Sequence, residues 1–217
     1  MRPLRVLVIG SRLTGDLMIW DRLGRALTAS PENPTILLHG AGEVTERILE
    51  GDGLSADLAG RDAVTDRAII AALRQENRKA VQGLTDNGLP AVGFLGVDRE
   101  LLTPGTARVR LLRQSADMGA VPVLGVAMGE PGKLSIPALA DACEALAASD
   151  SGHFRLIWVT NSRVAGKISA AQVRELSGEI SLPKASSFPN LSLRVLGVSE
   201  VGSVDPDRGA ELVFAEA

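Results

Sequence analysis

The sequence predicts an α/β fold in which helices cover both faces of a largely parallel β-sheet. Two observations support this prediction: short apolar runs rich in β-branched residues recur along the chain, and amphipathic helical patterns separate them. The first run, residues 5–9, ends at Gly10, and apolar residues then recur at helical spacing from Leu13 to Leu27. Repetition of such strand–helix units gives parallel strands joined by helical crossovers.

The second unit, residues 34–49, carries the predicted site. Its strand ends at His39, and the turn Gly40-Ala41-Gly42 leads into a helical pattern over residues 44–49. A strand-to-helix turn presents free backbone N–H groups, and glycines without a Cβ let an anion approach them closely. We therefore predict a phosphate site at this turn. The alternative is that the glycines only make a tight turn, since short glycine motifs often match by chance.

The rest of the chain continues the alternation of apolar runs and helical patterns. The predicted elements are a long helix capped by Thr65 or Asp66, a strand at 91–96, a strand at 107–112, a short amphipathic piece at 115–119, a strand at 121–126, a loop at 129–133, a helix from Ser135 to about Ala148, a strand at 154–159, a helix at 169–176 begun by a capping box, and strands at 193–198 and 211–214. Parallel strands gather their carboxyl ends, so the turns after His39, Gly96 and Thr160 should open on one edge.

Composition excludes several classes of protein. A net charge of −3, no Tyr and only two Trp argue against nucleic-acid binding and against an aromatic stacking platform. The chain enters a short strand directly after its first residues, which predicts no membrane segment. The single cysteine, Cys143, lies on an apolar helical face and predicts core packing in a reducing, cytoplasmic protein. No His, Cys, Asp and Glu cluster has metal-ligand spacing, so any metal should arrive with a nucleotide.

Six segments occur in a characteristic order: the His39 to Gly42 turn, residues 64–66 with Asn77 on the following helix, 91–96, 160–168, 182–184 and 209–212. This order resembles the amino-acid kinase family, most closely the acetylglutamate kinases, over nearly the whole chain. The corresponding family motifs include a His-Gly-Gly-Gly turn, a Thr-Asp-x-x-Gly-Val loop and a Met-x-Pro-Lys segment.

The resemblance implies one domain over residues 1–217, with three α/β/α layers and an open, mainly parallel, eight-stranded sheet. Residues 1–126 would form the acceptor-binding lobe and the contact with a homodimer partner, and residues 127–217 would form the nucleotide-binding lobe. The implied reaction is phosphoryl transfer from ATP with Mg2+ to a carboxylate of an acetylated amino acid. Nucleic acid and membrane are not implied partners.

Specific residues take roles through the same resemblance. They are Lys184 and Arg12 as catalytic cations, Gly10, Gly40, Ala41 and Gly42 for phosphate, Arg61, Thr65 and Ser135 for the acceptor, and Thr160, Asn161 and Lys167 for the nucleotide. No residue is assigned to a metal. Such a reaction brings several negative charges together, so catalysis depends mainly on positioning and on cationic and N–H stabilisation.

Several positions depart from the family pattern. Val8-Ile9-Gly10-Ser11 stands where the family has Lys-x-Gly-Gly, which leaves Arg12 as the nearby cation. Ala63 replaces the acceptor-binding arginine, and residues 135–139 lack the carboxylate of the family's Asn-x-Asn-x-Asp segment. Asn161 replaces an aspartate, and the chain is short between residues 96 and 121, where a hairpin would normally lie.

These departures leave two main hypotheses: a kinase with rearranged catalytic residues, or an inactive member that binds a small molecule or regulates another protein. An unrelated doubly wound nucleotide binder is a weaker third, because neither a P-loop nor a dinucleotide-binding glycine motif occurs. His39 also admits two interpretations. It could add a proton-linked positive charge beside the turn, but packing within the strand is preferred.

Overall fold

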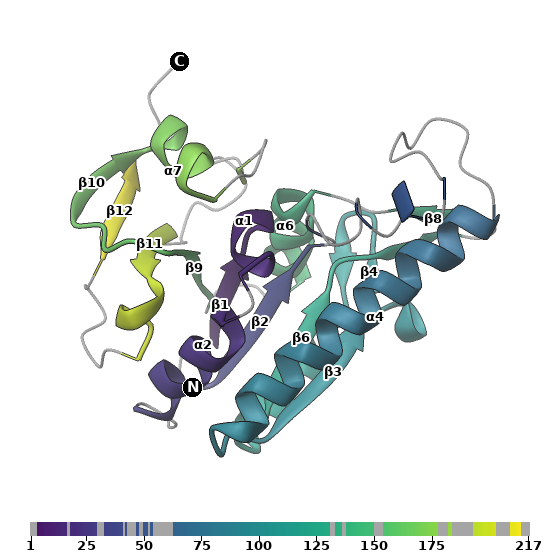
Figure 1. Ribbon diagram of the computed structural model, residues 1–217, viewed down its shortest axis with the longest axis horizontal. Coiled ribbons are helices and arrows are strands. Elements are labelled where there is room, and N and C mark those ends of the chain that lie inside the picture. The colour runs from purple at the N-terminus through teal and green to yellow at the C-terminus, as the bar shows by residue number, and fades with distance from the viewer. Residues whose placement is uncertain are drawn as a thin grey trace.

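An eight-stranded sheet runs through the molecule in the order β10-β12-β11-β9-β1-β2-β6-β3 (Figure 1). The computed structural model describes residues 4–16, 18–29, 33–40, 42, 47, 50–51, 53, 63–130, 133–135, 138–149, 154–177, 182–183, 193–202 and 209–213. The strands of this sheet are β1 (Leu4–Ile9), β2 (Thr35–His39), β3 (Ala91–Leu95), β6 (Val121–Gly125), β9 (Phe154–Thr160), β10 (Gly166–Ser169), β11 (Leu193–Gly197) and β12 (Ala210–Val213).

Six of these strands are parallel, from β3 at one edge to β11. β12 runs antiparallel to β11, and β10 at the other edge is parallel to β12. The predicted open, mainly parallel, eight-stranded sheet is therefore confirmed. The turns after His39, Gly96 and Thr160 follow parallel strands, so they open on the same edge as predicted.

Helices lie on both faces of the sheet and make three layers (Figure 1). The helices are α1 (Ser11–Thr14), α2 (Ile19–Thr28), α4 (Ala63–Asp86), α5 (Val109–Asp117), α6 (Leu139–Ser149) and α7 (Ala170–Ser177). Successive residues of β1 feed two separate cores, because side chains alternate across a strand. Leu7 packs in the core under α2 and α4, whereas Val8 packs in the core under α5 and α6.

The first predicted helix is broken into two. The leucine spacing predicts one helix from Leu13 to Leu27, but Gly15 and Asp16 separate α1 from α2. Oδ1 of Asp16 accepts a hydrogen bond from the Met18 backbone N–H at 2.9 Å, just ahead of α2. An aspartate side chain that accepts from the backbone N–H two residues further on forms an Asx turn, which fits the break between α1 and α2.

The prediction of a strand at 107–112 is wrong. β5 (Thr106–Ala107) pairs only with β4 (Leu102–Thr103), and α5 begins at Val109. The local alternation of apolar and polar residues suggested a strand, but the buried positions Val109, Leu112 and Ala116 recur at helical spacing. The β4–β5 pair also places a small hairpin between residues 96 and 121.

Three further boundaries differ from the predictions. α4 begins at Ala63, so Thr65 and Asp66 lie in its first turn rather than at its cap. In the predicted loop region, β7 (Met128–Glu130) pairs with β8 (Lys133–Ser135), so Ser135 ends a strand and α6 begins later. β10 was not predicted, because an exposed four-residue edge strand carries little apolar signal.

The predicted capping box before α7 is confirmed. The Ser169 backbone N–H donates to Oε1 of Gln172 at 3.0 Å, and the Gln172 N–H donates to Oγ of Ser169 at 3.3 Å. Cys143 is buried in the core as expected. Among the described residues, no helix combines the length and apolar composition that a membrane crossing needs.

Candidate functional site

The carboxyl edge of the sheet brings three predicted site residues into a row. β9, β1 and β2 are neighbours, and Ile9 pairs with both Val159 and His39 in register. Gly10 and Gly40 therefore follow paired residues, and Thr160 ends the strand next to them. This register could not be read from the sequence, because the strands lie far apart along the chain.

Packing explains two other glycines at this edge of the sheet, but it does not explain Gly40. A Cβ on Gly96 would lie 2.2 Å from the Ala127 carbonyl oxygen, and one on Gly125 would lie 2.8 Å from Leu95, so packing requires both glycines. A Cβ on Gly40 would meet only Leu139, at an ordinary 3.7 Å. Gly42 has a φ of 61°, a conformation that favours glycine. Within the described residues, the left-handed φ explains Gly42, whereas packing against Leu139 does not require a glycine at position 40.

His39 supports the Gly40 turn from inside the protein. Its ring is fully buried, and Nδ1 lies 3.0 Å from the Gly40 carbonyl oxygen. A carbonyl can only accept, so Nδ1 carries the proton and Nε2 accepts from Nδ2 of Asn77 at 3.2 Å. Burial lowers the pKa of His39 to about 4, while the Gly40 hydrogen bond opposes the shift. The packing interpretation of His39 is confirmed; burial rules out a positive charge at neutral pH.

Arg12 connects the start of the chain with its second half. It is exposed on α1, and Nη1 donates to the Glu175 carbonyl oxygen of α7 at 2.6 Å. A guanidinium has five N–H donors, so this contact does not exhaust its capacity to bind an anion. Arg12 therefore links α1, which follows Gly10, to α7.

The two predicted nucleotide residues after β9 have different surroundings. The Thr160 side chain is buried, and its hydroxyl donates to the Ser162 carbonyl oxygen at 2.8 Å. Asn161 is exposed, and its Oδ1 accepts from Nη2 of Arg22 at 3.3 Å. Arg22 also pairs with Asp16, so a chain of polar contacts crosses from the α1–α2 turn to the end of β9. No motif in the sequence marks Arg22, which sequence reasoning missed.

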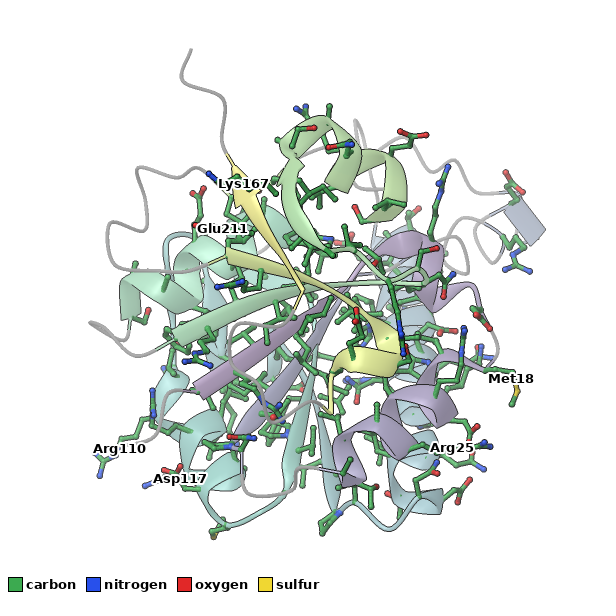
Figure 2. All side chains as sticks on the ribbon, turned by 90° about the vertical axis from the view of Figure 1, so that its left-hand side faces the viewer. Met18, Arg25, Arg110, Asp117, Lys167 and Glu211 are labelled. Atoms are coloured by element: carbon green, nitrogen blue, oxygen red, sulfur yellow. The ribbon has the colours of Figure 1, made fainter. Side chains whose placement is uncertain are left out.

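Other predicted residues lie elsewhere. Lys167 is exposed on β10, in register with Glu211 of the neighbouring strand β12 (Figure 2). Thr65 is buried in the first turn of α4, and Ser135 pairs with Met128 in the β7–β8 hairpin. Ala41, Arg61 and Lys184 lie outside the described residues, so their predicted roles remain predictions.

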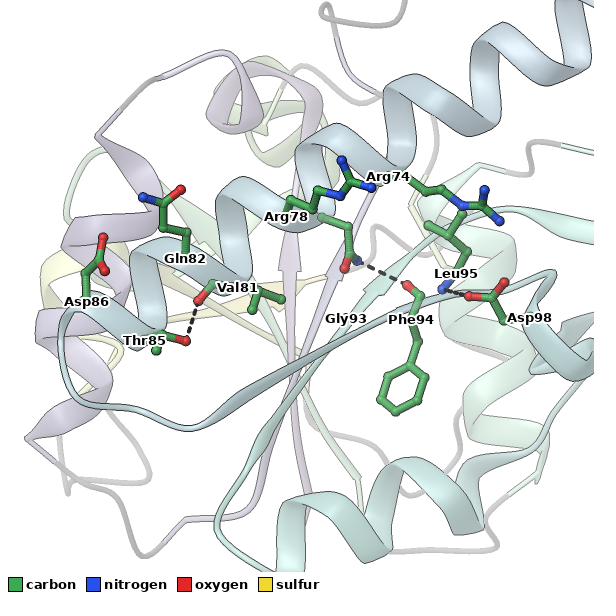
Figure 3. A pocket seen from close by; sticks show the side chains of 11 residues that line it. Arg74, Arg78, Val81, Gln82, Thr85, Asp86, Gly93, Phe94, Leu95 and Asp98 are labelled. Atoms are coloured by element: carbon green, nitrogen blue, oxygen red, sulfur yellow. Dashed lines mark hydrogen bonds between the residues drawn. The ribbon is translucent and has the colours of Figure 1, made fainter.

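A groove of about 520 Å³ lies between α4 and the edge strand β3 (Figure 3). Arg74, Arg78 and Asp98 line one end, and Oδ2 of Asp98 accepts from the Leu95 backbone N–H at 2.9 Å. Val81 gives the groove an apolar wall, whereas the Phe94 ring points away from α4 (Figure 3) and packs against the core under α5 and α6. Within the described part of the chain, no His, Cys, Asp and Glu cluster could hold a metal.

Comparisons with known proteins agree with the resemblance. The acetylglutamate kinase of Cereibacter sphaeroides (strain ATCC 17029 / ATH 2.4.9) is 26% identical over 217 aligned positions, which cover 84% of this chain and 74% of that protein. No family model matches the chain.

Solved structures show the same fold. N-acetylglutamate synthase from Neisseria gonorrhoeae, solved with coenzyme A and N-acetyl-glutamate, superposes with a TM-score of 0.64 at 16% identity. That match covers 100% of this chain but only 60% of the synthase. The isopentenyl phosphate kinase of T. acidophilum, solved as a product complex, gives a TM-score of 0.62 at 12% identity over 97% of this chain and 100% of that one.

Together the matches support a divergent member of the amino-acid kinase family. At the sequence level, two positions depart from the family pattern that the chain resembles: Val8 stands where that pattern has a lysine, and Asn161 stands where it has an aspartate.

Proposed function

We propose that the protein binds ATP with Mg2+ and transfers a phosphoryl group to a carboxylate of an acetylated amino acid. The observation that carries this proposal is that neither packing nor a left-handed φ requires a glycine at position 40, at the edge where Gly10 and Gly40 follow paired strands. A glycine that neither packing nor a left-handed φ requires is explained by the close approach of a ligand. The match to acetylglutamate kinase supports the choice of acceptor.

The proposed reaction forms a bond between an acceptor carboxylate oxygen and the γ-phosphorus, and it breaks the bond from that phosphorus to the oxygen leaving with ADP. We assign the Gly40 turn to the transferred phosphoryl group and Arg12 and Lys184 to its negative charge. His39 holds the Gly40 carbonyl oxygen and acts as a positioning residue. The acceptor would contact residues 1–126 and the nucleotide residues 127–217.

Calorimetric titration of the full chain with Mg-ATP, with and without N-acetylglutamate, tests this proposal. Gly40→Val should weaken Mg-ATP or acceptor binding about tenfold or more, because its branched side chain fills the space beside the backbone. Gly51→Val is the matched control, since a Cβ at Gly51 has no neighbour within 4 Å. Equal affinity in the wild type and Gly40→Val would overturn the assignment of the turn.

A binding or regulatory role without turnover is the second candidate, and one observation favours it. Val8, at the position of the missing family lysine, is fully buried in the core under α5 and α6. A buried β-branched side chain supplies no cation to the site. Binding of Mg-ATP without formation of ADP or a phosphorylated acceptor would favour this role over catalysis.

We also propose that the protein is a cytoplasmic homodimer, with β3 as part of the contact. β3 is an edge strand, its Val92 is 42% exposed, and the α4–β3 groove runs beside it. Open strand edges favour pairing with another chain. Light scattering should give twice the chain mass, and Val92→Lys should reduce it to one chain mass.

A further inference from the structure

The turn that ends α4 contains the Asn-Gly pair of the chain, Asn87-Gly88, which occurs once in the sequence. Gly88 has a φ of 81°, and its N–H donates to the Thr85 carbonyl oxygen at 2.9 Å. The Leu89 N–H donates to the Leu84 carbonyl oxygen at 3.1 Å, so the two bonds form a Schellman motif with glycine at its left-handed position. The end of α4 therefore favours a glycine directly after Asn87.

The Asn87 side chain joins this turn to α2. Its Nδ2 donates to Oδ1 of Asp21 on α2 at 3.0 Å and to the Gly83 carbonyl oxygen of α4 at 2.8 Å. The helices approach so closely that a Cβ on Gly24 of α2 would lie 2.9 Å from both Cβ and Nδ2 of Asn87. The Thr28 hydroxyl, at the end of α2, lies 3.2 Å from the Asn87 carbonyl oxygen. Asn87 therefore belongs to the contact between α2 and α4.

An Asn-Gly pair is also a site of known chemical lability. The backbone nitrogen of the glycine, after losing its proton, attacks Cγ of the asparagine and closes a succinimide ring. The bond from Cγ to Nδ2 breaks, and Nδ2 leaves as ammonia with a proton from solvent. Water then adds to a ring carbonyl group and opens the ring to aspartate or isoaspartate. Glycine hinders this attack least, because it carries no side chain.

The folded structure opposes this reaction at Asn87. The Gly88 N–H is held by its hydrogen bond within the turn, and the Nδ2 leaving group is held by Asp21 and Gly83. Close packing against Gly24 restrains the asparagine side chain from turning toward the Gly88 nitrogen. Gly88 itself is exposed, so water reaches the turn. Reaction therefore requires that α2 separates from the end of α4.

We propose that Asn87 is a site of spontaneous deamidation, gated by the separation of α2 from α4, and that deamidation weakens the contact between these helices. The new carboxylate repels Asp21 and leaves the Gly83 carbonyl oxygen without its donor. The Asn87 hydrogen bond is also the largest cause that holds the pKa of Asp21 below its ordinary value, so Asp21 is charged when the new carboxylate forms. The change persists, because the ammonia is lost.

Peptide mapping by mass spectrometry tests the gate on the full chain, aged at mildly alkaline pH either folded or in urea. The exposed Asn161, which precedes a serine, is the internal reference. In urea, Asn87 should deamidate faster than Asn161, because glycine hinders the attack less than serine. In the folded chain, Asn87 should react about tenfold more slowly than in urea, since only opened molecules react. Equal rates at Asn87 in the folded and unfolded chain would overturn the proposal.

Variants at the contact open the gate. Gly24→Ala should raise the folded-state rate at Asn87 about fivefold or more, because the added methyl group displaces α2 from the asparagine. Gly51→Ala, where a Cβ meets no described atom within 4 Å, is the matched control and should leave the rate unchanged. If Gly24→Ala does not fold, Thr28→Val, which removes the hydroxyl beside Asn87, replaces it. A rate equal to that of the wild type contradicts the gate.

Hydrogen exchange measures the effect of deamidation on the helices. In the deamidated fraction, separated by ion exchange, the amides of α2 should exchange about threefold faster or more, while those of α6 should not change. Asn87→Asp should reproduce the effect. Gln82→Glu, the same change of charge at an exposed position of α4, is its control and should leave α2 unchanged. Unaltered exchange of α2 in the deamidated fraction would refute the proposed weakening.

Discussion

Glu76 and Asn77 are adjacent buried polar residues on α4, and their side chains differ in how many hydrogen-bond partners they have. Nδ2 of Asn77 lies 3.1 and 3.0 Å from the carbonyl oxygens of Phe94 on β3 and Val123 on β6 and 3.2 Å from Nε2 of His39 on β2, and its two hydrogens are shared among these three acceptors. Glu76 has one partner, Lys79, and a second oxygen without one among the described residues.

The difference separates a polar group that joins several elements from one that does not. Asn77 connects α4 to three strands, and the fit is close enough that a Cβ on Gly93 would lie 2.0 Å from Oδ1 of Asn77. Satisfied networks of this kind fix one arrangement of a core. Glu76 instead pairs with Lys79 of its own helix, and its Oε2 is inaccessible and has no partner among the described residues. Burial alone would not have distinguished the two residues.

The largest loss of stability is expected for Asn77→Leu, which keeps the side-chain volume and removes the hydrogen-bond donor. Two buried strand carbonyls and His39 lose a partner, so we expect the free energy of unfolding to fall by about 3 kcal/mol or more. Urea denaturation measures the change. Gln75→Leu, at an exposed position of the same helix, is the control and should shift stability by less than about 0.5 kcal/mol. Equal changes in the free energy of unfolding for the two variants would mean that the Asn77 hydrogen bonds do not stabilise the fold.

A change of pH tests the His39 end of the network. The folded pKa of about 4 lies below the ordinary value of 6.5, so the unfolded chain binds the proton more readily. The stability that neutral His39 contributes to the fold is therefore fully present above pH 6.5 and is lost as pH falls toward about 4. A depression of roughly 2.5 units corresponds to about 3 kcal/mol. Denaturation at a series of pH values should show this loss in the wild type.

The matched variants for that experiment are His39→Gln and His153→Gln, which remove the two histidines of the chain one at a time. The difference in stability between the wild type and His39→Gln should shrink as the pH falls through this range. The His153 variant should keep the acid dependence of the wild type. An unchanged profile in His39→Gln would show that another group titrates.

The smallest expected effect on stability is that of Glu76→Gln. The variant loses an ion pair with Lys79, whose side chain is 40% exposed and remains solvated. It also removes a buried charge that lacks a full set of donors. These effects oppose each other, so the free energy of unfolding should change by less than about 1 kcal/mol in either direction. A loss of 3 kcal/mol, as expected for Asn77→Leu, would make Glu76 a structural residue like its neighbour.

Prediction of the fold from sequence succeeded where a segment carries a long, unambiguous pattern. β1, β2 and β9 are continuous apolar runs, and α4 keeps a helical period over 24 residues. It failed at the start of α5, where apolar and polar residues alternate as in a strand over the five residues 107–111. A short segment fits both periods, and packing of Leu112 and Ala116 into the core decides for the helix.

The sequence predicts that Gly10 and Gly40 belong to the site, but it does not show that they lie next to each other. Their neighbouring position follows from the pairing of Ile9 with His39, a contact between strands 30 residues apart. The ordinary contact that a Cβ on Gly40 would make likewise depends on where Leu139 packs. Arg22 and Glu76 had no sequence signal, since a charged residue on an amphipathic helix usually faces solvent.

The alternation of strands and helices, the parallel sheet and the likeness to amino-acid kinases can all be predicted from the sequence. They depend on apolar periodicity and motif order, which can be read directly along the chain. The folded structure is needed to see which polar groups are satisfied and which glycines are not required by packing. Those properties depend on distances between segments far apart in sequence. At Glu76 and Asn77 they differ completely between adjacent residues, because successive side chains of a helix point in different directions.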